Sequence, residues 1–550
     1  MDDKPLLVQS DRSLLLEVHH PAFEAARADL APFAELEKSP EHIHTYRMSP
    51  LSLWNAASAG LSPDQVLEIL DQRSRYAVPE SVQFFVRDIM GRWGLFQLDA
   101  TDHPETLVLR VADEHLRREL ANQKRLAPIL TARGDDFLLP LLHRGTLKKE
   151  MLALGYPVQD LAPLKKGDPL AVSLRTATLG GHPLHIRDYQ KGAADGLLGR
   201  GQPGTGFGTI VLPCGSGKTV VGLEILTRLA TNTLVLTTNV AAVHQWIDEI
   251  LDKTTLVADE VGEYTGERKV IRPVTVATYQ VLVWREDKDA DYPHFRLFRE
   301  HNWGLIIYDE VHLLPAPVFR VTSELQAVRR VGLTATLVRE DGAEGDVFSL
   351  VGPKRYDVPW KELEARGWIA QALCTEIRLE LPENLRIPYA VAAKREKFRI
   401  ASENPGKDDV VRQLIDNHRE DAILVIGQYL DQLQRLARLL KAPLITGSTP
   451  NAQREVLYDQ FRRGEVRVIV VSKVANFAID LPDASMAIQV SGTFGSRQEE
   501  AQRLGRILRP KKKDAWFYTL VSRATSEEEY SAHRQKFLTE QGYQYRIDVF

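Results

Sequence analysis

The sequence predicts a mixed α/β protein in which two small domains precede two tandem domains, each built on a parallel sheet. From about residue 173 onward, apolar strand-like runs alternate with helical patterns, which is typical of βαβ units. Residues 1–172 instead mix short helical patterns with short strands and contain few glycines. The length of 550 residues agrees with this layout, because about 150 residues per domain gives three to four domains.

Composition narrows the class of protein. Hydrophobic residues make up 44% and charged residues 26%, which is ordinary for a soluble globular chain. Seventy Lys and Arg against 74 Asp and Glu give a net charge of −4, which excludes a polybasic protein but not an enzyme with a local basic groove. Cys214 and Cys374 are too few for a disulfide framework or a four-thiolate zinc site. The first ten residues show no secretion signal, and no apolar run approaches a membrane span, so we expect a cytoplasmic, nucleoid-associated protein.

The first domain is expected to cover residues 1–100 and to contain three helices. Ser49-Pro50 and Ser62-Pro63 start two of them and Pro79 starts the third, because serine caps free N–H groups and proline lacks the donor that would stay unpaired. A strand-like run follows at 94–98. These elements are consistent with a winged-helix-like module, or with a small helical bundle used for packing.

The second domain, residues 101–172, is expected to be a small α+β unit. Strand-like runs at 105–111 and 136–142 alternate with helices that start near Asp113 and Thr146. The pattern alone indicates no chemistry for this unit.

The two parallel-sheet domains are expected at 173–355 and 356–550. Apolar runs predict strands of the first at 209–213, 233–237, 274–278, 305–309 and 331–334, and of the second at 422–427, 466–472, 487–491 and 515–520. The charged stretch of about 355–420 has a helical period and joins the two sets.

A glycine-rich loop follows the first of these strands. Residues 212–219 read Leu-Pro-Cys-Gly-Ser-Gly-Lys-Thr, and a helix is expected to begin at Lys218. Backbone N–H groups of such a loop bind phosphates, while Lys218 neutralises the β- and γ-phosphates of ATP and the Thr219 hydroxyl holds Mg²⁺. Leu212 departs from the full pattern, which has glycine there. The residues expected to contact the nucleotide are Pro213, Cys214, Gly215, Ser216, Gly217, Lys218 and Thr219.

Two carboxylates end the strand at 305–309. Asp309 is expected to hold Mg²⁺ through water, and Glu310 to polarise the attacking water. Two acids after a strand are often only a solvated turn, but the phosphate loop upstream favours a catalytic pair. His312 would link the nucleotide site to the next motif, with a surface histidine as the alternative.

Two arginines mark the last domain. Arg506 and Arg509 are three residues apart on a predicted helix and therefore share one face, with Gln502 preceding them. Guanidinium groups placed in this way can stabilise transition-state charge at a γ-phosphate. A solvated basic helix is the alternative.

Together these motifs resemble those of superfamily-two helicases, whose fold is two tandem RecA-like lobes. The resemblance implies further roles by motif position. It implies nucleotide binding for Arg187 and adenine reading for Gln190, strand contact for Gln280, and nucleotide sensing for Asp480. It implies coupling of hydrolysis to movement for Thr334, Thr336 and Gln502.

One segment sharpens this resemblance. Residues 333–341 place Arg339-Glu340-Asp341 directly behind Thr-Ala-Thr, which is similar to the XPB family of DNA helicases, and the DEVH box at 309–312 agrees. Residues 45–66, 348–370 and 490–510 are also similar, so that the resemblance covers nearly the whole chain and points to the bacterial branch.

The XPB resemblance implies an ATP- and Mg²⁺-dependent DNA helicase of 3′→5′ polarity that opens duplex DNA in excision-type repair or transcription. It also implies a damage-recognition-like domain at about 101–172 and a helical thumb within about 382–420. A nuclease partner and a monomeric state belong to the same expectation.

DNA contacts are expected at two places. Lys394, Lys397, Phe398 and Arg399 form a basic run with an aromatic residue inside it, which can follow phosphates and stack on bases, although many such runs are solvated helix faces. The family resemblance implies a fork contact for Arg339, Glu340 and Asp341, with an internal ion pair as the alternative. A double-strand translocase, an ATP-switched DNA-binding scaffold and an RNA helicase remain alternative functions.

Overall fold

The computed structural model of the chain describes residues 4–38, 42–103, 105–199, 204–213, 215–287, 292–298, 301–314, 318, 325, 328–335, 344–358, 360–368, 372–472, 484–492, 515–532 and 544–550. These residues divide into two compact units. One contains Met1–Val211 and Gly217–Asp357, and the other contains Leu212–Ser216 and Val358–Phe550. None of the helices in the described ranges is long and apolar enough to cross a membrane.

The N-terminal domain combines the three predicted helices with a sheet that was not predicted. The helices are α2 (Pro50–Ser58), α3 (Pro63–Arg73) and α4 (Glu80–Gly91), preceded by α1 (Phe23–Leu30). Ser49 and Ser62 close capping boxes, and each such cap stabilises a helix by about 0.5–2 kcal/mol.

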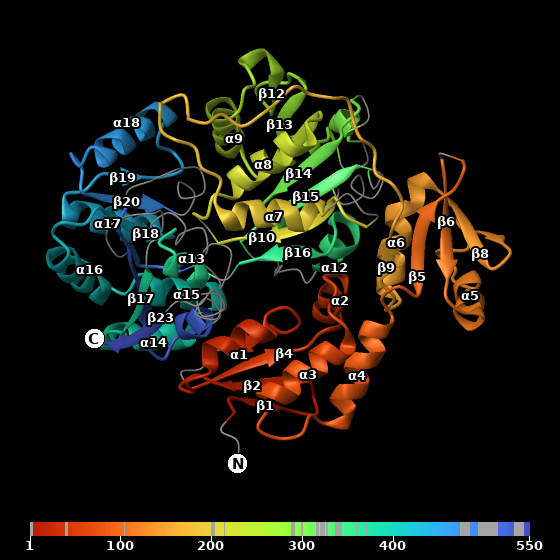
Figure 1. Cartoon of the computed structure of the whole chain (residues 1–550). Coiled ribbons are helices and arrows are strands. Elements are labelled where there is room, and N and C mark those ends of the chain that lie inside the picture. Colours follow the sequence, from red (N-terminus) through yellow and green to blue (C-terminus); the bar gives the residue numbers. More distant parts are fainter. Residues whose placement is uncertain are drawn as a thin grey trace. The chain divides into compact units, whose positions relative to one another are not determined.

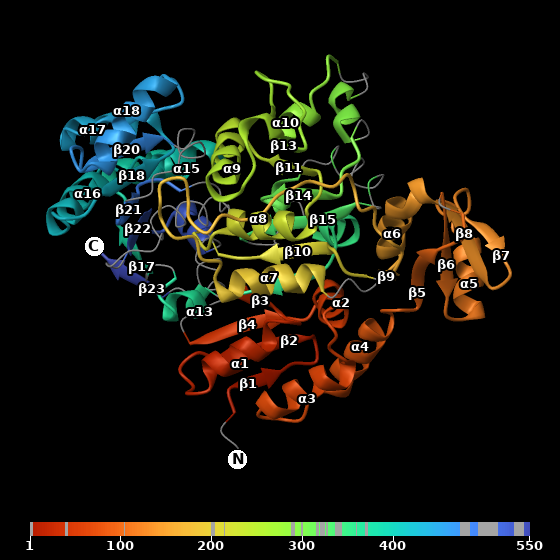
Figure 2. The same cartoon turned by 45° about the horizontal axis from the view of Figure 1, so that its top comes forward.

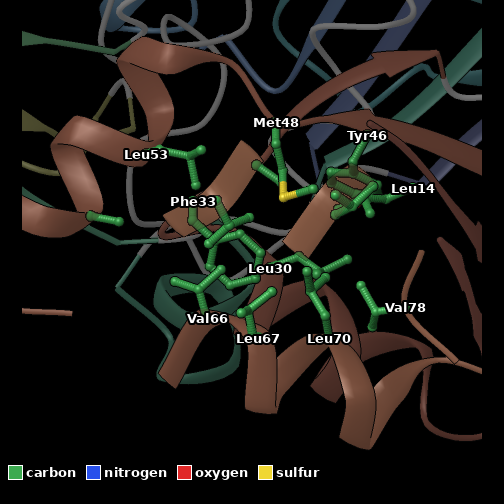
Figure 3. Close-up of a cluster of buried hydrophobic side chains, with 14 of the residues drawn as sticks. Leu14, Leu30, Phe33, Tyr46, Met48, Leu53, Val66, Leu67, Leu70 and Val78 are labelled. Carbon is green, nitrogen blue, oxygen red and sulfur yellow. The ribbon is translucent and has the colours of Figure 1, made fainter. Parts of the chain in front are cut away.

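The antiparallel sheet has the order β1-β2-β4-β3. Its strands are β1 (Leu6–Val8), β2 (Ser13–Glu17), β3 (Glu35–Lys38) and β4 (Ile43–Arg47). The expectation of a helical module is therefore corrected to an α+β domain, whose core Figure 3 shows between the sheet and the helices. The strands are three to five residues long, too short for a reliable alternation of apolar residues.

The second small domain has a five-stranded sheet of order β7-β8-β6-β5-β9. Its strands are β5 (Phe96–Ala100), β6 (Thr106–Val111), β7 (Thr131–Arg133), β8 (Asp136–Pro140) and β9 (Val158–Asp160), and its helices are α5 (Glu114–Ala121) and α6 (Arg144–Ala153). β5 corresponds to the run predicted at 94–98, but it pairs with β6 and β9 rather than with the N-terminal domain. The boundary between the small domains therefore lies before β5.

The first lobe has a seven-stranded parallel sheet of order β12-β13-β11-β14-β15-β10-β16. The five predicted strands are present as β10 (Phe207–Val211), β11 (Thr233–Thr237), β13 (Val274–Thr278), β14 (Leu305–Asp309) and β15 (Arg329–Thr334). The two edge strands, β12 (Val261–Tyr264) and β16 (Lys354–Asp357), were not predicted. Helices α7 (Asp188–Leu198), α8 (Lys218–Leu229) and α9 (Val240–Lys253) accompany the sheet (Figures 1 and 2). The short helices α10 (Tyr279–Leu282) and α12 (Glu344–Asp346) complete the named α-helices of this lobe.

The second lobe has another seven-stranded parallel sheet, of order β19-β20-β18-β21-β22-β17-β23. Four strands were predicted: β18 (Ile423–Gly427), β20 (Val468–Ser472), β21 (Met486–Gln489) and β22 (Ala515–Ser522). The strands not predicted are β17 (Ala372–Leu379), β19 (Leu444–Ile445) and β23 (Gln544–Val549). β17 corrects the expectation that 355–420 is a helical connection, because this strand lies within the sheet between β22 and β23.

Helices of the second lobe are α13 (Trp360–Ala365), α14 (Glu383–Val391), α15 (Lys394–Ser402), α16 (Gly406–Asn417), α17 (Leu430–Leu440) and α18 (Asn451–Arg462). The thumb expected at about 382–420 covers α14 to α16. α16 buries Val410, Val411 and Leu414 in the core of the lobe, and α15 also has a buried face, whereas α14 has no buried residue.

Candidate active site

The parallel sheet of the first lobe brings the predicted motifs to one edge. β10 leads into the phosphate loop, β14 ends at Asp309 and β15 ends at Thr334. β13 ends at Thr278, directly before Tyr279 and Gln280. Because carboxyl ends of parallel strands lie on the same side of a sheet, four separate sequence motifs meet there, which is where α/β proteins bind ligands.

The phosphate loop adopts a backbone that its glycines permit. Gly215 and Gly217 have φ values of 77° and 80°, in the left-handed region that other residues rarely adopt. A Cβ added to Gly217 would lie 2.7 Å from Nε2 of Gln190, so a side chain here would have to displace Gln190 in addition to adopting a strained backbone. Within the loop, the Ser216 hydroxyl donates to the Pro213 carbonyl at 2.6 Å.

The helix that follows the loop begins at Lys218, as predicted. The first N–H groups of a helix lack partners within the helix and carry a partial positive charge. Lys218 and Thr219 lie in this first turn. The arrangement is therefore suited to bind a phosphate chain.

Gln190 lies beside the phosphate loop and is buried. Its Oε1 accepts a hydrogen bond from the Arg187 backbone N–H at 2.9 Å, which caps the start of α7. Arg187 donates to the Tyr189 hydroxyl at 3.1 Å. Gln190 thus lies next to Gly217 of the phosphate loop, and its adenine-reading role stays a prediction.

Asp309 is a half-buried carboxylate held in a fixed orientation. Its Oδ2 accepts from Nε1 of Trp246 at 2.9 Å, and its Oδ1 accepts from the Glu310 backbone N–H at 3.1 Å. Burial, together with the neighbouring charge of Glu310, raises the pKa of the Asp309 carboxyl to about 6. A divalent cation would favour the ionised form. An all-oxygen donor set of this carboxylate and the Thr219 hydroxyl fits Mg²⁺.

Glu310 lies between a cation and a histidine. Its Oε1 is 3.5 Å from Nζ of Lys218, and its Oε2 is 3.5 Å from Nδ1 of His312. The backbone of Glu310 has φ of 49°, in the left-handed region, which a glutamate adopts only at some cost. Strain of this kind is common where a side chain is aimed at a functional site.

His312 connects the acid pair to the end of β15. This side chain is buried, and its Nδ1 lies 2.6 Å from the Thr334 hydroxyl oxygen. Glu310, His312 and Thr334 therefore form a continuous chain of contacts, and the coupling role of His312 stays a prediction.

Two aromatic residues of the site were missed by sequence reasoning. Trp246 on α9 binds Asp309 and packs against α8, where a Cβ on Gly222 would lie 2.6 Å from the indole. The Tyr279 hydroxyl donates to the Asp309 carbonyl at 2.9 Å. The sequence offers a signal for Tyr279, because this residue lies between Thr278 and Gln280 of one motif. It offers none for Trp246, because an apolar residue at helical spacing is usually part of the hydrophobic core.

Several predicted site residues lie outside the described residues. They are Cys214, Thr336, Arg339, Glu340, Asp341, Asp480, Gln502, Arg506 and Arg509. Their roles stay predictions.

The expected DNA contacts are only partly compatible with the structure. Gln280 and Lys394 are exposed. Nζ of Lys397 lies 5.7 Å from the ring centre of Tyr389. Arg399 is paired with Glu403 and Asp431, at 2.7 and 2.8 Å.

Phe398 corrects the expectation of a stacking aromatic. It is 1% exposed and packs edge-on against Tyr530, with ring centres 5.3 Å apart. It shares the buried face of α15 with Ala401 and Ser402, so it anchors the helix and has no face for a base.

Family models match most of the chain. The ERCC3/RAD25/XPB C-terminal helicase model matches residues 363–549. A model of a helicase conserved C-terminal domain matches 6–135, and one of the type III restriction enzyme res subunit matches 183–339.

Similar proteins carry the same family name. A DNA 3′-5′ helicase XPB of Kineococcus radiotolerans is 52% identical over 551 residues, covering 100% of this chain and 97% of the relative. A DNA 3′-5′ helicase XPB of Mycobacterium tuberculosis is 51% identical over 552 residues, covering 100% and 98%. The general transcription and DNA repair factor IIH helicase/translocase subunit XPB/SSL2 of Saccharomyces cerevisiae is 31% identical over 614 residues, covering 99% of this chain and 72% of the relative.

A solved structure shares part of this fold. A fragment of an HsdR subunit of a type I restriction enzyme from Vibrio vulnificus has a TM-score of 0.50 at 17% identity, covering 67% of this chain and 69% of that one. Sequence identity over the full length, a matching family model and the phosphate-loop geometry agree, and the chain belongs to the XPB family of helicases.

Proposed function

We propose that this chain is an ATP-driven DNA helicase of 3′→5′ polarity that opens duplex DNA. The observation that carries the proposal is the chain of contacts from Lys218 through Glu310 and His312 to Thr334. This chain of contacts connects groups suited to ATP hydrolysis with the Thr-Ala-Thr motif that begins at Thr334, the last residue of β15. The names of the two bacterial relatives, DNA 3′-5′ helicase XPB, support the DNA substrate and the polarity.

In this mechanism, the phosphate loop and the first turn of α8 bind the triphosphate, and Lys218 neutralises its charge. Mg²⁺, held by Thr219 and Asp309, would supply charge stabilisation to the phosphates. Glu310 orients the attacking water and accepts its proton. Arg506 and Arg509 are proposed to stabilise transition-state charge.

Coupling to DNA is proposed to pass through His312. A change in charge at Glu310 alters its contact with His312, and His312 in turn bears on Thr334 and the segment after β15. Thr336, Gln502 and the nucleotide sensor Asp480 are proposed to act in the same step. Adenine reading is proposed for Gln190, and Arg187 is proposed as a further nucleotide contact.

DNA contacts are proposed for Gln280, Lys394 and Lys397, and for the triplet Arg339, Glu340 and Asp341. The motifs offer backbone contacts rather than base reading, so binding should depend on phosphates and shape. The XPB/SSL2 relative is named as a transcription and DNA repair factor subunit, which supports a role in repair or transcription. Damage recognition by residues 101–172 and cooperation with a nuclease complete the proposal.

The proposal is tested by steady-state ATP hydrolysis without nucleic acid and then with single-stranded DNA, duplex DNA or RNA. We expect strong stimulation by DNA, and Lys218→Ala should lower turnover by at least about 100-fold because the phosphates lose their neutralising charge. Stimulation by RNA alone would favour an RNA helicase. No response to DNA would favour the ATP-switched scaffold and contradict the proposal.

A further inference from the structure

A cavity of about 330 Å³ lies within the first unit, at a place where three of its domains meet. Ser58 and Trp93 line it from the N-terminal domain and Lys148 from the second small domain. Phe207 and Arg355 line it from the first lobe. This volume is within the range of small-molecule sites, and the cavity is separate from the carboxyl edge of the sheet, because Phe207 is the first residue of β10.

The aromatic ring of Phe207 is surrounded by cations. Nζ of Lys148 lies 5.4 Å from the ring centre, and the guanidinium carbons of Arg330 and Arg355 lie 5.2 and 5.5 Å from it. Three positive charges are therefore concentrated around one buried ring. The cation–π contacts themselves stabilise each charge only modestly.

Among the described residues, one carboxylate, that of Asp160, pairs with a cation of this cluster, Lys148. Asp160 binds Arg144 through two hydrogen bonds of 3.0 and 2.8 Å, and its Oδ2 lies 3.1 Å from Nζ of Lys148. Although burial opposes it, Arg144 and Lys148 hold the pKa of Asp160 well below its usual range. Asp160 is thus already neutralised, mainly by Arg144.

Lys148 and Arg355 keep donors for a further anion. Lys148 is 5% exposed, and among the described residues it donates one of its three N–H groups, to Asp160. Arg355 donates to the carbonyls of Ser58, Gly204 and Phe207, which uses three of its five N–H groups and supplies no negative charge.

Burial lowers the pKa of Lys148 to about 7 and that of Arg355 to about 10. A buried cation that lacks a full counter-charge is costly, and an anion would remove that cost. Phosphate suits this pair, because lysine contributes a point charge and arginine contributes directed donors.

The rest of the lining indicates what the anion is attached to. Trp93, Phe207 and Phe348 line the cavity, and the rings of Trp93 and Phe348 meet edge to face with centres 6.3 Å apart. Aromatic walls of this kind accommodate flat rings. We propose that this cavity binds a small organic phosphate that carries a flat ring, with Lys148 and Arg355 contacting the phosphate.

The proposal is tested by calorimetric titration of full-length Lys218→Ala protein with AMP, adenosine and inorganic phosphate. The Lys218→Ala background weakens phosphate binding at the proposed ATP site. We expect one AMP per chain, and binding of adenosine and of inorganic phosphate at least tenfold weaker than that of AMP.

Variants in the same background assign the site. Lys148→Met keeps the apolar stem and leaves Asp160 paired with Arg144, and it should weaken AMP at least tenfold, as should Arg355→Gln. The control is Arg110→Gln, which removes an exposed cation of the same small domain and should leave AMP binding unchanged. Circular dichroism confirms folding, and Lys148→Met alone decides the matter if Arg355→Gln does not fold.

Unchanged AMP affinity in Lys148→Met, or no binding of AMP in the Lys218→Ala background, would overturn the proposal. Adenosine that binds as tightly as AMP would exclude the phosphate contact, and inorganic phosphate that binds as tightly would exclude the ring. None of these outcomes depends on DNA-stimulated hydrolysis, so this site and the helicase function can fail separately.

Discussion

Asp309 illustrates how one residue sets the chemistry of the site. Burial raises its pKa to about 6 from 3.8, so the folded chain without metal binds a proton more readily than the unfolded chain. Between these two values the native state carries more protons, and stability contributed by this group falls as pH rises. Ionised Asp309 therefore destabilises the metal-free fold at pH 8. Asp309→Asn does not titrate, although its amide NH2 replaces one of the two oxygens that accept from Trp246 and from the Glu310 N–H. The melting temperature of this variant relative to the native chain should therefore rise as pH increases through about 6, whatever the fixed cost of the lost acceptor. Thermal unfolding of both proteins from pH 5 to 8, without metal, measures it, and a pH-independent difference would contradict the raised pKa.

A second prediction for a single residue is that His312 couples ATP hydrolysis to movement along DNA. His312→Ala removes the side chain between Glu310 and Thr334, while Lys218 and Asp309 remain in place. We expect ATP hydrolysis to fall only a few fold and strand displacement to fall about tenfold or more, because the loss of one buried hydrogen-bond link of about 1.5 kcal/mol corresponds to roughly that factor. His244→Ala is the control, since this histidine is 56% exposed. Equal losses of hydrolysis and displacement would mean that His312 has no coupling role.

Residues of the site were predictable where a motif fixes their type and order. Lys218, Asp309, Glu310 and His312 follow strands that read clearly in the sequence, and the structure brings them together. Trp246 acts through a single indole N–H, and periodicity cannot separate such a residue from core. Phe398 shows the opposite error, in which a buried anchor among basic residues was taken for a contact residue.

At the scale of elements, burial decided which strands could be predicted. β11, β13 and β18 are buried along their whole length and read as continuous apolar runs. The edge strands β12, β16, β19 and β23 were missed, because they have two to six residues and their partners are far away in the sequence. β17 was missed inside the sheet, because polar residues such as Glu376 and Arg378 interrupt its apolar pattern.

The second lobe depends on a buried ion pair that connects α16 with the segment after β22. Nζ of Lys407 lies 2.9 Å from Glu527 and donates to the Val490 carbonyl at 2.9 Å. Lys407→Met leaves the Glu527 charge buried, and removing one partner of such a pair costs about 3–5 kcal/mol. We expect this variant to unfold at lower denaturant concentration, and Lys407→Met combined with Glu527→Gln to recover part of the loss. The exposed pair of Arg412 and Asp409 is the control, because Arg412→Met should change little. A double variant no more stable than Lys407→Met would contradict this account.

At the scale of the whole molecule, DNA affinity should respond to salt through a few lysines. Lys394→Ala with Lys397→Ala should flatten the dependence of log affinity on log salt by about 1.4 units for single-stranded DNA, if each lysine contacts one phosphate. Arg399→Ala is a matched control on the same helix, since Arg399 is paired with two carboxylates. Affinity measured from 50 to 200 mM salt gives the slopes. An unchanged slope in the double variant would mean that α15 faces solvent.

The most direct test of the motor is strand displacement from duplexes that carry a 3′ or a 5′ single-stranded tail, with Glu310→Gln as the inactive control. We expect ATP-dependent displacement from the 3′-tailed duplex and none from the 5′-tailed one, while Glu310→Gln binds ATP but displaces the strand of neither duplex. DNA-stimulated hydrolysis without displacement from either duplex would contradict the helicase and favour a double-strand translocase.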